Sequence, residues 1–142
     1  MCSSDLTVGM ERNRLRDPLT GRLREISGEQ DRWVEASFRH DIPHSNIAWG
    51  ASASHGHVTT TYFLTEIGRS WEGPVWLNAF VEHKDIAGLK VKAIVGNLLN
   101  ARHRFDRAVY DGRRDSGDPI AYYQSQKQLI GPIFELSVRG NF

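Results

Sequence analysis

The feature that most constrains this sequence is the alternation of apolar and polar residues, which recurs along most of its length. In the segment GPIFELSVRGNF, apolar or small side chains occupy the even positions from Pro132 to Phe142, and polar ones the odd positions from Glu135 to Asn141. A period of two residues places successive side chains on opposite faces of a β-strand. The same pattern recurs in WVEASFRH, IAWGASAS, PVWLNAFVEH and LKVKAIVGN. The sequence therefore predicts an all-β protein whose strands each have one apolar face.

Turn-forming residues separate these segments and indicate how the strands are connected. The expected strands, about six in number, cover residues 7–16, 29–40, 47–67, 72–84, 89–110 and 120–142. Tight turns are expected at 41–46 and 85–88, and longer links at 17–28, 68–72 and 111–119. Pro132 cannot donate a hydrogen bond to a neighbouring strand, so we expect a bulge or break within the last strand. Together these features predict an antiparallel meander with its tight turns at one end.

The composition limits the possible functions. The chain has 142 residues, enough for one domain, with 18 Lys and Arg against 17 Asp and Glu. This balance gives no electrostatic reason to bind nucleic acid or an acidic membrane surface. No run approaches the ~18 apolar residues of a transmembrane helix. The single cysteine, Cys2, excludes an intramolecular disulfide and a cysteine-rich metal site.

The first residues, MCSSDL, have neither the basic region nor the apolar region of a secretory signal peptide. They resemble a cloning or assembly scar. We therefore expect residues 1–6 to be non-native, residues 7–142 to be the protein itself, and the natural chain to begin further upstream.

Alternation by itself leaves two architectures open. In a soluble β-sandwich the apolar face forms the core, whereas in a barrel in lipid it points outward and the polar face lines the lumen. Two features favour the barrel. Aromatic residues lie near strand ends, at Trp49, Trp71, Trp76 and Phe142, as in the aromatic girdles of membrane barrels. The last strand also has alternating apolar residues and a terminal aromatic residue. In outer-membrane barrels, the assembly machinery recognises such a C-terminal pattern.

Several segments resemble the C-terminal part of the TonB-dependent outer-membrane receptors. The likeness is carried by VKAIVGNLLNARHRF (91–105), by the hairpin FVEHKDIAGL (80–89) and by the closing strand GPIFELSVRGNF (131–142). Within the first of these, a late barrel strand is expected to contain the family motif Asn97, Leu98, Leu99 and Asn100. DPLTGRLREISGEQ (17–30) and DIPHSNIAWGAS (41–52) are also similar. The resemblance covers nearly all of residues 7–142.

The resemblance implies an open segment of a large transmembrane β-barrel, which in this class has about 22 strands and a plugged lumen. Such receptors lie in the bacterial outer membrane and use energy from TonB to take up siderophores, cobalamin or glycans. This sequence has neither the plug nor the TonB box, so we expect a wall segment that is no enzyme and needs no cofactor or metal. Its expected partners are outer-membrane lipid, the barrel assembly machinery, the plug and other strands of the same receptor, and TonB through that plug.

The resemblance also assigns positions. The outer-membrane assembly signal is expected at Phe134, Leu136, Val138, Gly140 and Phe142, although a bulky residue in place of Gly140 would strengthen it. The side chains expected to contact lipid are Val34, Ala36, Phe38, Val75, Leu77, Ala79, Val81, Leu89, Val91, Ala93, Val95, Leu136, Val138 and Phe142. The side chains expected to face the lumen are Glu35, Arg39, Glu82, Lys90, Lys92, Glu135 and Arg139.

Histidine pairs are the main candidates for metal ligands. His55 and His57 would share one strand face, but no third ligand is near, so a polar luminal or loop stretch is the favoured interpretation. His40 and His44 cannot align on a helix because Pro43 lies between them. We therefore expect no metal site.

The remaining polar residues also have simple explanations. Tyr122 and Tyr123 are expected in a girdle or in loop packing, and Arg113 and Arg114 in a solvated external loop. The luminal charges are expected to form a hydrated network rather than an acid–base pair for catalysis. The alternative to the receptor interpretation is a complete small β-barrel or a soluble β-sandwich binding module.

Overall fold

The computed structural model describes residues 1–73 and 75–140, and every regular element within them is a β-strand. The strands are β1 (Cys2–Met10), β2 (Arg14–Arg16), β3 (Leu23–Glu25), β4 (Gln30–Asp41), β5 (Ile47–Val58), β6 (Thr61–Tyr62), β7 (Glu66–Gly73), β8 (Trp76–Ile86), β9 (Leu89–Gly96), β10 (Arg102–Tyr110), β11 (Ile120–Leu129) and β12 (Ile133–Gly140). The all-β prediction, which rested on the two-residue period, is confirmed.

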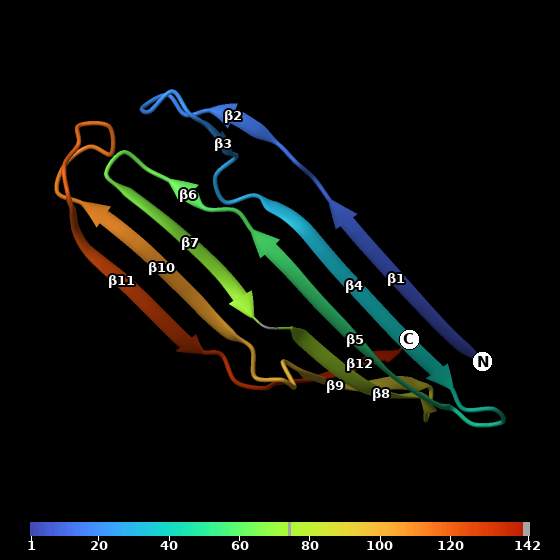
Figure 1. The fold of residues 1–142 in the computed structure, drawn as a ribbon. Helices are drawn as coiled ribbons and strands as arrows, with labels where there is room; N and C mark the ends of the chain where they lie inside the picture. Colours follow the sequence, from blue (N-terminus) through green and yellow to red (C-terminus); the bar gives the residue numbers. More distant parts are fainter. Residues whose placement is uncertain (74, 141–142) are drawn as a thin grey trace.

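The strands form antiparallel sheets that follow one meander (Figure 1). A six-stranded sheet has the order β1-β4-β5-β8-β9-β12, a four-stranded sheet has the order β11-β10-β7-β6, and β2 pairs with β3. Strands such as β5 and β6, or β9 and β10, are the two halves of one long strand with a short interruption. The two larger sheets therefore lie end to end along the strand direction.

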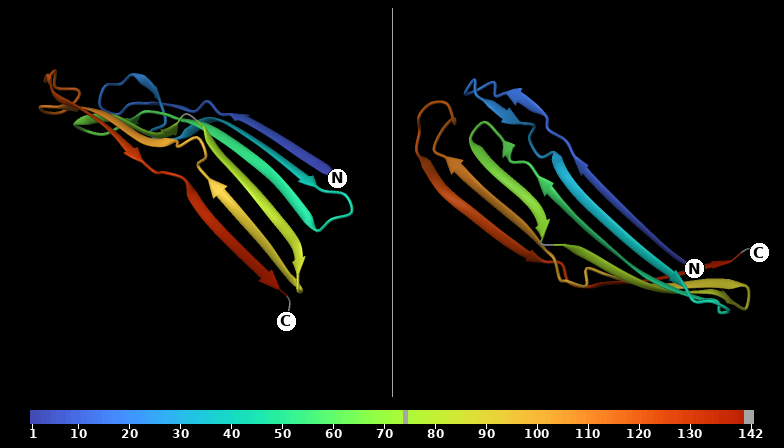
Figure 2. Two further views of the ribbon diagram at one scale, coloured as in Figure 1. Left: turned by 90° about the horizontal axis from the view of Figure 1, so that it is seen from below. Right: turned by 45° about the vertical axis from the view of Figure 1, so that its right-hand side comes forward.

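The meander is a single, curved layer (Figure 2). In the part of the chain that the structure describes, the edge strands β1 and β12 do not pair with one another, so the sheet is open. The buried apolar side chains among these residues are those of Ala48 and Ala101. A β-sandwich needs two stacked sheets with a shared apolar core. The observed single layer has a different architecture.

The turns divide the molecule into a tight-turn end and a loop end, as the sequence predicts. The tight turns at 41–46 and 85–88 lie at the end that also holds the N-terminus, and the loops at 17–22 and 111–119 lie at the opposite end (Figure 1). The second tight turn uses Gly88, whose φ of 82° lies in the left-handed region that glycine adopts without strain.

Three strand limits differ from the prediction. Residues 23–25, expected within the link 17–28, form β3. Residues 68–72, expected as a link, lie inside β7, and the chain turns earlier, at 63–65. Gly68 allows close strand pairing rather than a turn, because a Cβ there would lie 3.1 Å from the Cβ of Arg107. In addition, β1 begins at Cys2 and not at residue 7. Residues 2–6 pair with β4 through their backbone, which demands no particular side chain.

Breaks interrupt the long strands near the junction of the two larger sheets. As predicted from Pro132, the last strand is broken there, between Leu129 and Ile133. The Asn97–Asn100 motif, expected within a strand, instead forms the break between β9 and β10. Both asparagines adopt positive φ, 54° and 52°, which no strand ladder accommodates.

Candidate functional site

One face of the six-stranded sheet carries a broad set of apolar side chains, with Arg32, His40, His55, His57 and His83 towards the two ends of its strands. Directly paired residues lie on the same face, so the register aligns Phe38, Ala51, Ala79, Val95 and Phe134 in one row. We call this side the apolar face. Its apolar and small side chains are those of Leu6, Val8, Met10, Val34, Ala36, Phe38, Trp49, Ala51, Ala53, Leu77, Ala79, Val81, Leu89, Val91, Ala93, Val95, Phe134, Leu136, Val138 and Gly140.

The apolar face is open to its surroundings. On β12, Phe134 is 78% exposed and Leu136 is 69% exposed. The residues expected to contact lipid share this face, apart from Val75, which lies outside the ladders, and Phe142, which lies outside the described residues. The other four residues of the expected assembly signal also lie on it. A continuous apolar surface of this kind marks an interaction site.

The opposite side, which we call the polar face, carries the charges expected for a lumen. They are Glu35, Arg39, Glu82, Lys90, Lys92, Glu135 and Arg139. The densest group surrounds Glu82, whose side chain is almost fully buried. Arg39 Nη2 lies 2.8 Å from one Glu82 carboxylate oxygen, and Lys90 Nζ lies 3.1 Å from the other. The two faces of the sheet therefore differ sharply in charge.

The ion-pair network extends from Glu82 towards the tight turns, and further charges surround a hollow beside β12. Towards the tight turns, Asp41 lies 3.1 Å from Arg39 and 2.6 Å from Lys84 Nζ. Towards β12, a hollow is lined by Lys92, Glu135 and Arg139. The ion pairs therefore join Arg39, Asp41, Glu82, Lys84 and Lys90. Among the described residues no ion pair is formed by Glu35, Lys92, Glu135 or Arg139.

A buried asparagine closes the break between β9 and β10. Asn97 is completely buried. Its Oδ1 accepts a 2.6 Å hydrogen bond from Ala101 N, while its Nδ2 donates to Ala101 O at 3.1 Å and to Gly131 O at 2.9 Å. The side chain thus supplies the partner that the Ala101 backbone lacks at the break, and it also ties this break to the one beside Pro132.

Thr59 has a similar role at the break between β5 and β6. It is also completely buried, and its Oγ1 donates to Ile26 O at 2.5 Å and accepts from Glu29 N at 2.9 Å. Buried backbone groups without partners are destabilising. The side chains of Asn97 and Thr59 therefore provide hydrogen-bond partners for backbone groups near the breaks, which would otherwise be buried without a partner.

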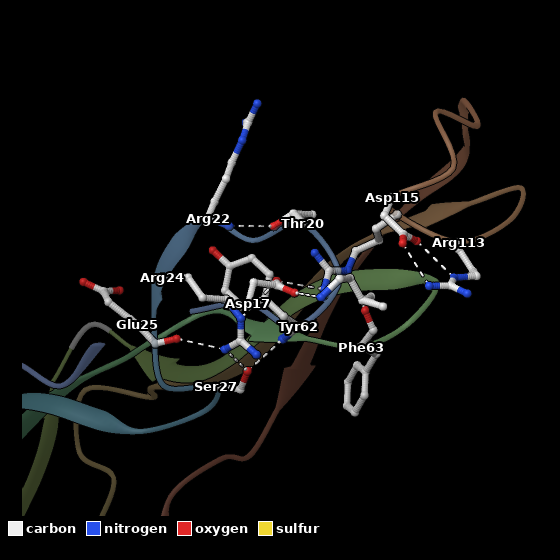
Figure 3. Close-up of polar contacts among 12 residues, drawn as sticks. Asp17, Thr20, Arg22, Arg24, Glu25, Ser27, Tyr62, Phe63, Arg113 and Asp115 are labelled. Atoms are coloured by element: carbon white, nitrogen blue, oxygen red, sulfur yellow. Dashed lines mark hydrogen bonds and ion pairs between the residues drawn. The ribbon is translucent and has the colours of Figure 1, made fainter. Parts of the chain in front are cut away.

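At the loop end, one carboxylate joins three loops (Figure 3). Asp17 belongs to the loop between β2 and β3 and is buried. Its Oδ2 lies 3.0 Å from Arg114 Nη2, in the loop between β10 and β11, and 3.1 Å from Arg24 Nε. Arg114 Nε in turn donates a 2.5 Å hydrogen bond to Phe63 O, in the loop between β6 and β7. We call Asp17, Arg24 and Arg114 the loop clamp.

The loop clamp corrects one prediction. Arg114 was expected to be solvated, but its side chain is only 6% exposed. The expectation holds for Arg113, whose side chain is 57% exposed and pairs with Asp115. Arg114 is buried because it reaches back across the sheet to Asp17, a partner too distant in sequence for any local pattern to indicate.

Hydrogen bonds keep the Asp17 carboxylate ionised. Leu19 N donates a 2.8 Å hydrogen bond to Oδ1. This bond, together with that from Arg114, lowers the pKa of Asp17 to about 2, although burial acts in the opposite direction. The bond to the residue two positions later is typical of an Asx turn, and the Asp-Pro pair that opens this loop could have indicated it.

The histidine pairs form no cluster of metal ligands. His55 and His57 share a face, as predicted, but they lie at the loop-side margin of the apolar face rather than on the polar face. His57 Nδ1 lies 2.5 Å from Asp31 Oδ1, and His40 Nδ1 lies 2.7 Å from Cys2 Sγ. Within residues 1–73 and 75–140, no three His, Cys, Asp or Glu side chains come close enough to hold a metal ion.

The four-stranded sheet carries charged and polar side chains on both faces, interspersed with apolar ones such as Ile67, Leu129 and Phe105. One face carries Arg69, Trp71, Arg102, Arg104, Asp106 and Lys127. The other carries Glu66, Ser70, Glu72, His103, Arg107, Gln124 and Gln126. Tyr122 and Tyr123 lie in β11, on opposite faces, and are both exposed. Exposed apolar side chains such as Leu129 also occur on this sheet, but they lie among charged residues.

Comparison with known proteins finds no protein family, no curated protein and no solved structure that matches this chain. The described residues form no helix with the length and apolar character that crossing a membrane requires. A function must therefore be argued from the two faces of the sheet and their chemistry.

Proposed function

We propose that this chain forms part of the wall of a large outer-membrane β-barrel of the TonB-dependent receptor class. The observation that carries the proposal is a single open sheet with an exposed apolar face on one side and a charged face on the other. In water the apolar face would lack cover, whereas in lipid its burial contributes about 25 cal/mol per Å². The apolar face would contact lipid, and the polar face would line the lumen.

The dimensions of the six-stranded sheet support this proposal. Its strands contain 8 to 12 residues, close to the ~9–11 residues that a tilted strand needs to cross a bilayer. Trp49 lies on the apolar face next to the tight-turn end, where an aromatic girdle is expected. Trp76, also expected in the girdle, lies instead on the polar face. The four-stranded sheet, which carries charged side chains on both faces, would project from the membrane with the loops.

The open edges indicate the remaining partners. In lipid the unpaired backbone groups of β1 and β12 need neighbouring strands, because the bilayer core offers no hydrogen bonds. These strands would come from the rest of the receptor, placed by the barrel assembly machinery. With the plug and TonB, the complete wall would serve energised uptake of a siderophore, cobalamin or glycan. The resemblance of residues 80–105 and 131–142 to such receptors supports this class.

Tryptophan fluorescence tests which face meets lipid. Two single-tryptophan variants of the chain retain either Trp49, on the apolar face, or Trp76, on the polar face, with the other tryptophans changed to Phe. Both are folded into phosphatidylcholine vesicles with bromine atoms on the acyl chains. We expect strong quenching of Trp49 and weak quenching of Trp76. Equal quenching of the two, or a Trp49 emission that vesicles leave unchanged, would falsify the proposal.

A further inference from the structure

A group of cations lies on one face of the four-stranded sheet, next to the apolar face. The register places Trp71, Arg104 and Lys127 in one row, with Arg69 and Arg102 in the rows on either side. We call Arg69, Arg102, Arg104 and Lys127 the cationic patch. Among the described residues none of the four has an ion pair or a side-chain hydrogen bond.

The patch contains hydrogen-bond donors that lack acceptors. Nε of Arg69 and Nε of Arg104 are both shielded from solvent, and neither has a partner within the described part of the chain. A shielded donor without an acceptor is unfavourable until one reaches it. Asp106 is the acidic residue on this face, and it forms no ion pair with the described residues. The patch is therefore strongly positive and incompletely bonded.

A hollow on the polar face shows on which side the patch lies. This hollow is lined by Glu72 together with Trp33, Ser54 and Trp76 of the six-stranded sheet. Glu72 is therefore on the polar side of the molecule. Side chains alternate along β7, so Trp71 and Arg69 lie on the side of the apolar face. The cationic patch thus continues the apolar face towards the loop end.

The sequence of chemistry along this side matches that of an amphiphile. Apolar side chains such as Leu77 come first, and Arg102 lies in the first row of the four-stranded sheet. Trp71 shares the next row with Arg104 and Lys127, and Arg69 lies one row further towards the loop end. The guanidinium of Arg69 lies 4.5 Å from the centre of the Trp71 ring, and Leu129, which is exposed, lies in the row of Arg102. Tryptophan is typical of the interface between acyl chains and headgroups, and arginine binds phosphate with two parallel hydrogen bonds.

We propose that the cationic patch binds the phosphate groups of an anionic lipid in the leaflet at the loop end, while the acyl chains of that lipid cover the apolar face. This inference rests on the proposed function, because the patch is a lipid site only if the apolar face lies in a bilayer. It adds a specific ligand chemistry, a phosphorylated lipid headgroup, that the barrel-wall proposal by itself does not contain.

The test compares the full chain in vesicles of different composition. Phosphatidylcholine vesicles carry either a bisphosphorylated glycolipid or the same glycolipid without its phosphates. Binding is read from the emission of a full-length variant that retains Trp71, with the other three tryptophans changed to Phe. We expect the phosphates to tighten binding at least tenfold, since each cation near an anionic surface contributes on the order of tenfold or slightly less. Inorganic phosphate at the same concentration should not displace the lipid. Equal binding to the two glycolipids, or effective competition by inorganic phosphate, would overturn the inference.

Variants locate the effect. Arg69→Gln with Arg104→Gln should lose at least tenfold of the phosphate-dependent affinity. The control is Arg107→Gln, on the same strand as Arg104 but on the opposite face, which should retain it. Lys127→Gln, on the exposed strand β11, serves if the double variant does not fold. A patch variant that binds as tightly as the control contradicts the inference.

The two proposals fail in different ways. Insertion into phosphatidylcholine alone, read from quenching of Trp49, tests the barrel wall. The increment that the phosphates add to binding tests the patch. If the chain inserts but the phosphates do not increase its affinity, only the lipid-site proposal is contradicted. If the chain inserts into neither kind of vesicle, both proposals are contradicted.

Discussion

The six-stranded and four-stranded sheets are made from the same long strands, yet their surfaces differ. In the six-stranded sheet, apolar residues gather on one face and charges on the other. In the four-stranded sheet, both faces carry charged and amide side chains. Backbone pairing is antiparallel in both. The two sheets therefore differ in side-chain chemistry and not in backbone pairing. The change in chemistry occurs where the long strands are interrupted.

The interruptions make this boundary a structural feature as well as a chemical one. Asn97 and Thr59, the two largest fully buried side chains of the described residues, both lie at breaks. Each satisfies backbone groups that a continuous ladder would have paired. The apolar face of the six-stranded sheet is not covered by any other part of the described structure. The junction between the two larger sheets, in contrast, is stabilised by buried hydrogen bonds within the protein.

The largest expected effect comes from placing a charge on the apolar face. Ala51→Arg, in the middle of β5, should destabilise the chain in vesicles by about 2–4 kcal/mol, because the cation would lie in acyl chains. Ser52→Arg is the matched control, since it adds the same side chain one residue away on the polar face. Urea unfolding of both variants in phosphatidylcholine vesicles measures the difference. Similar losses in the two would contradict the assignment of the faces.

A smaller effect is expected at the junction. Asn97→Gly should lower the free energy of unfolding by about 1–3 kcal/mol, because the Ala101 backbone loses its buried partners. Asn100→Gly is the control. Both asparagines have positive φ, so glycine relieves the same backbone strain at each position. Asn100→Gly should therefore be neutral or slightly stabilising. Equal changes at the two positions would mean that the Asn97 side chain contributes little.

The smallest effect is expected at the loop clamp, and it depends on pH. The pKa of Asp17 is lowered to about 2 from a usual value of 3.8, so the folded state binds the proton less readily than the unfolded state. The stabilisation from Asp17 is therefore complete above the usual pKa and is lost as the pH falls from about 4 to about 2.

Asp17→Asn should remove this contribution and flatten the acid limb of the stability curve. The measurement is the urea midpoint in detergent micelles across that pH range. Asp115→Asn, which removes an exposed carboxylate from the same loop end, should leave the acid limb in place. An unchanged acid limb in Asp17→Asn would show that other carboxylates determine it.

The regular part of the fold follows from local sequence patterns. The two-residue period indicated which residues share a face, and the register bears this out from Val34 to Val138. The segment Asp-Ile-Ala-Gly at 85–88 predicts a tight turn, because glycine adopts left-handed φ without strain, and Gly88 has such a φ. Pro132 gave the break in the last strand because proline lacks an amide hydrogen.

The irregular part depends on contacts between distant residues. Gly68 looked like part of a turn, although its role is to let Arg107 approach from the neighbouring strand. Asn97 belongs to a local sequence motif, but its side chain donates a hydrogen bond to Gly131, which lies 34 residues further along the chain. The pair of Asp17 and Arg114 spans 97 residues. No window along the sequence contains both members of such pairs, so only the folded structure shows them.

The loop clamp has a consequence for how the loops respond to one another. Asp17 and Arg114 connect the loop between β2 and β3, the loop between β10 and β11 and, through Phe63, the loop between β6 and β7. A ligand that pulls one of these loops from its position has to break bonds to the others. Binding at one loop is then energetically coupled to the remaining two, and the coupling is reciprocal. The three loops are therefore expected to move together rather than independently.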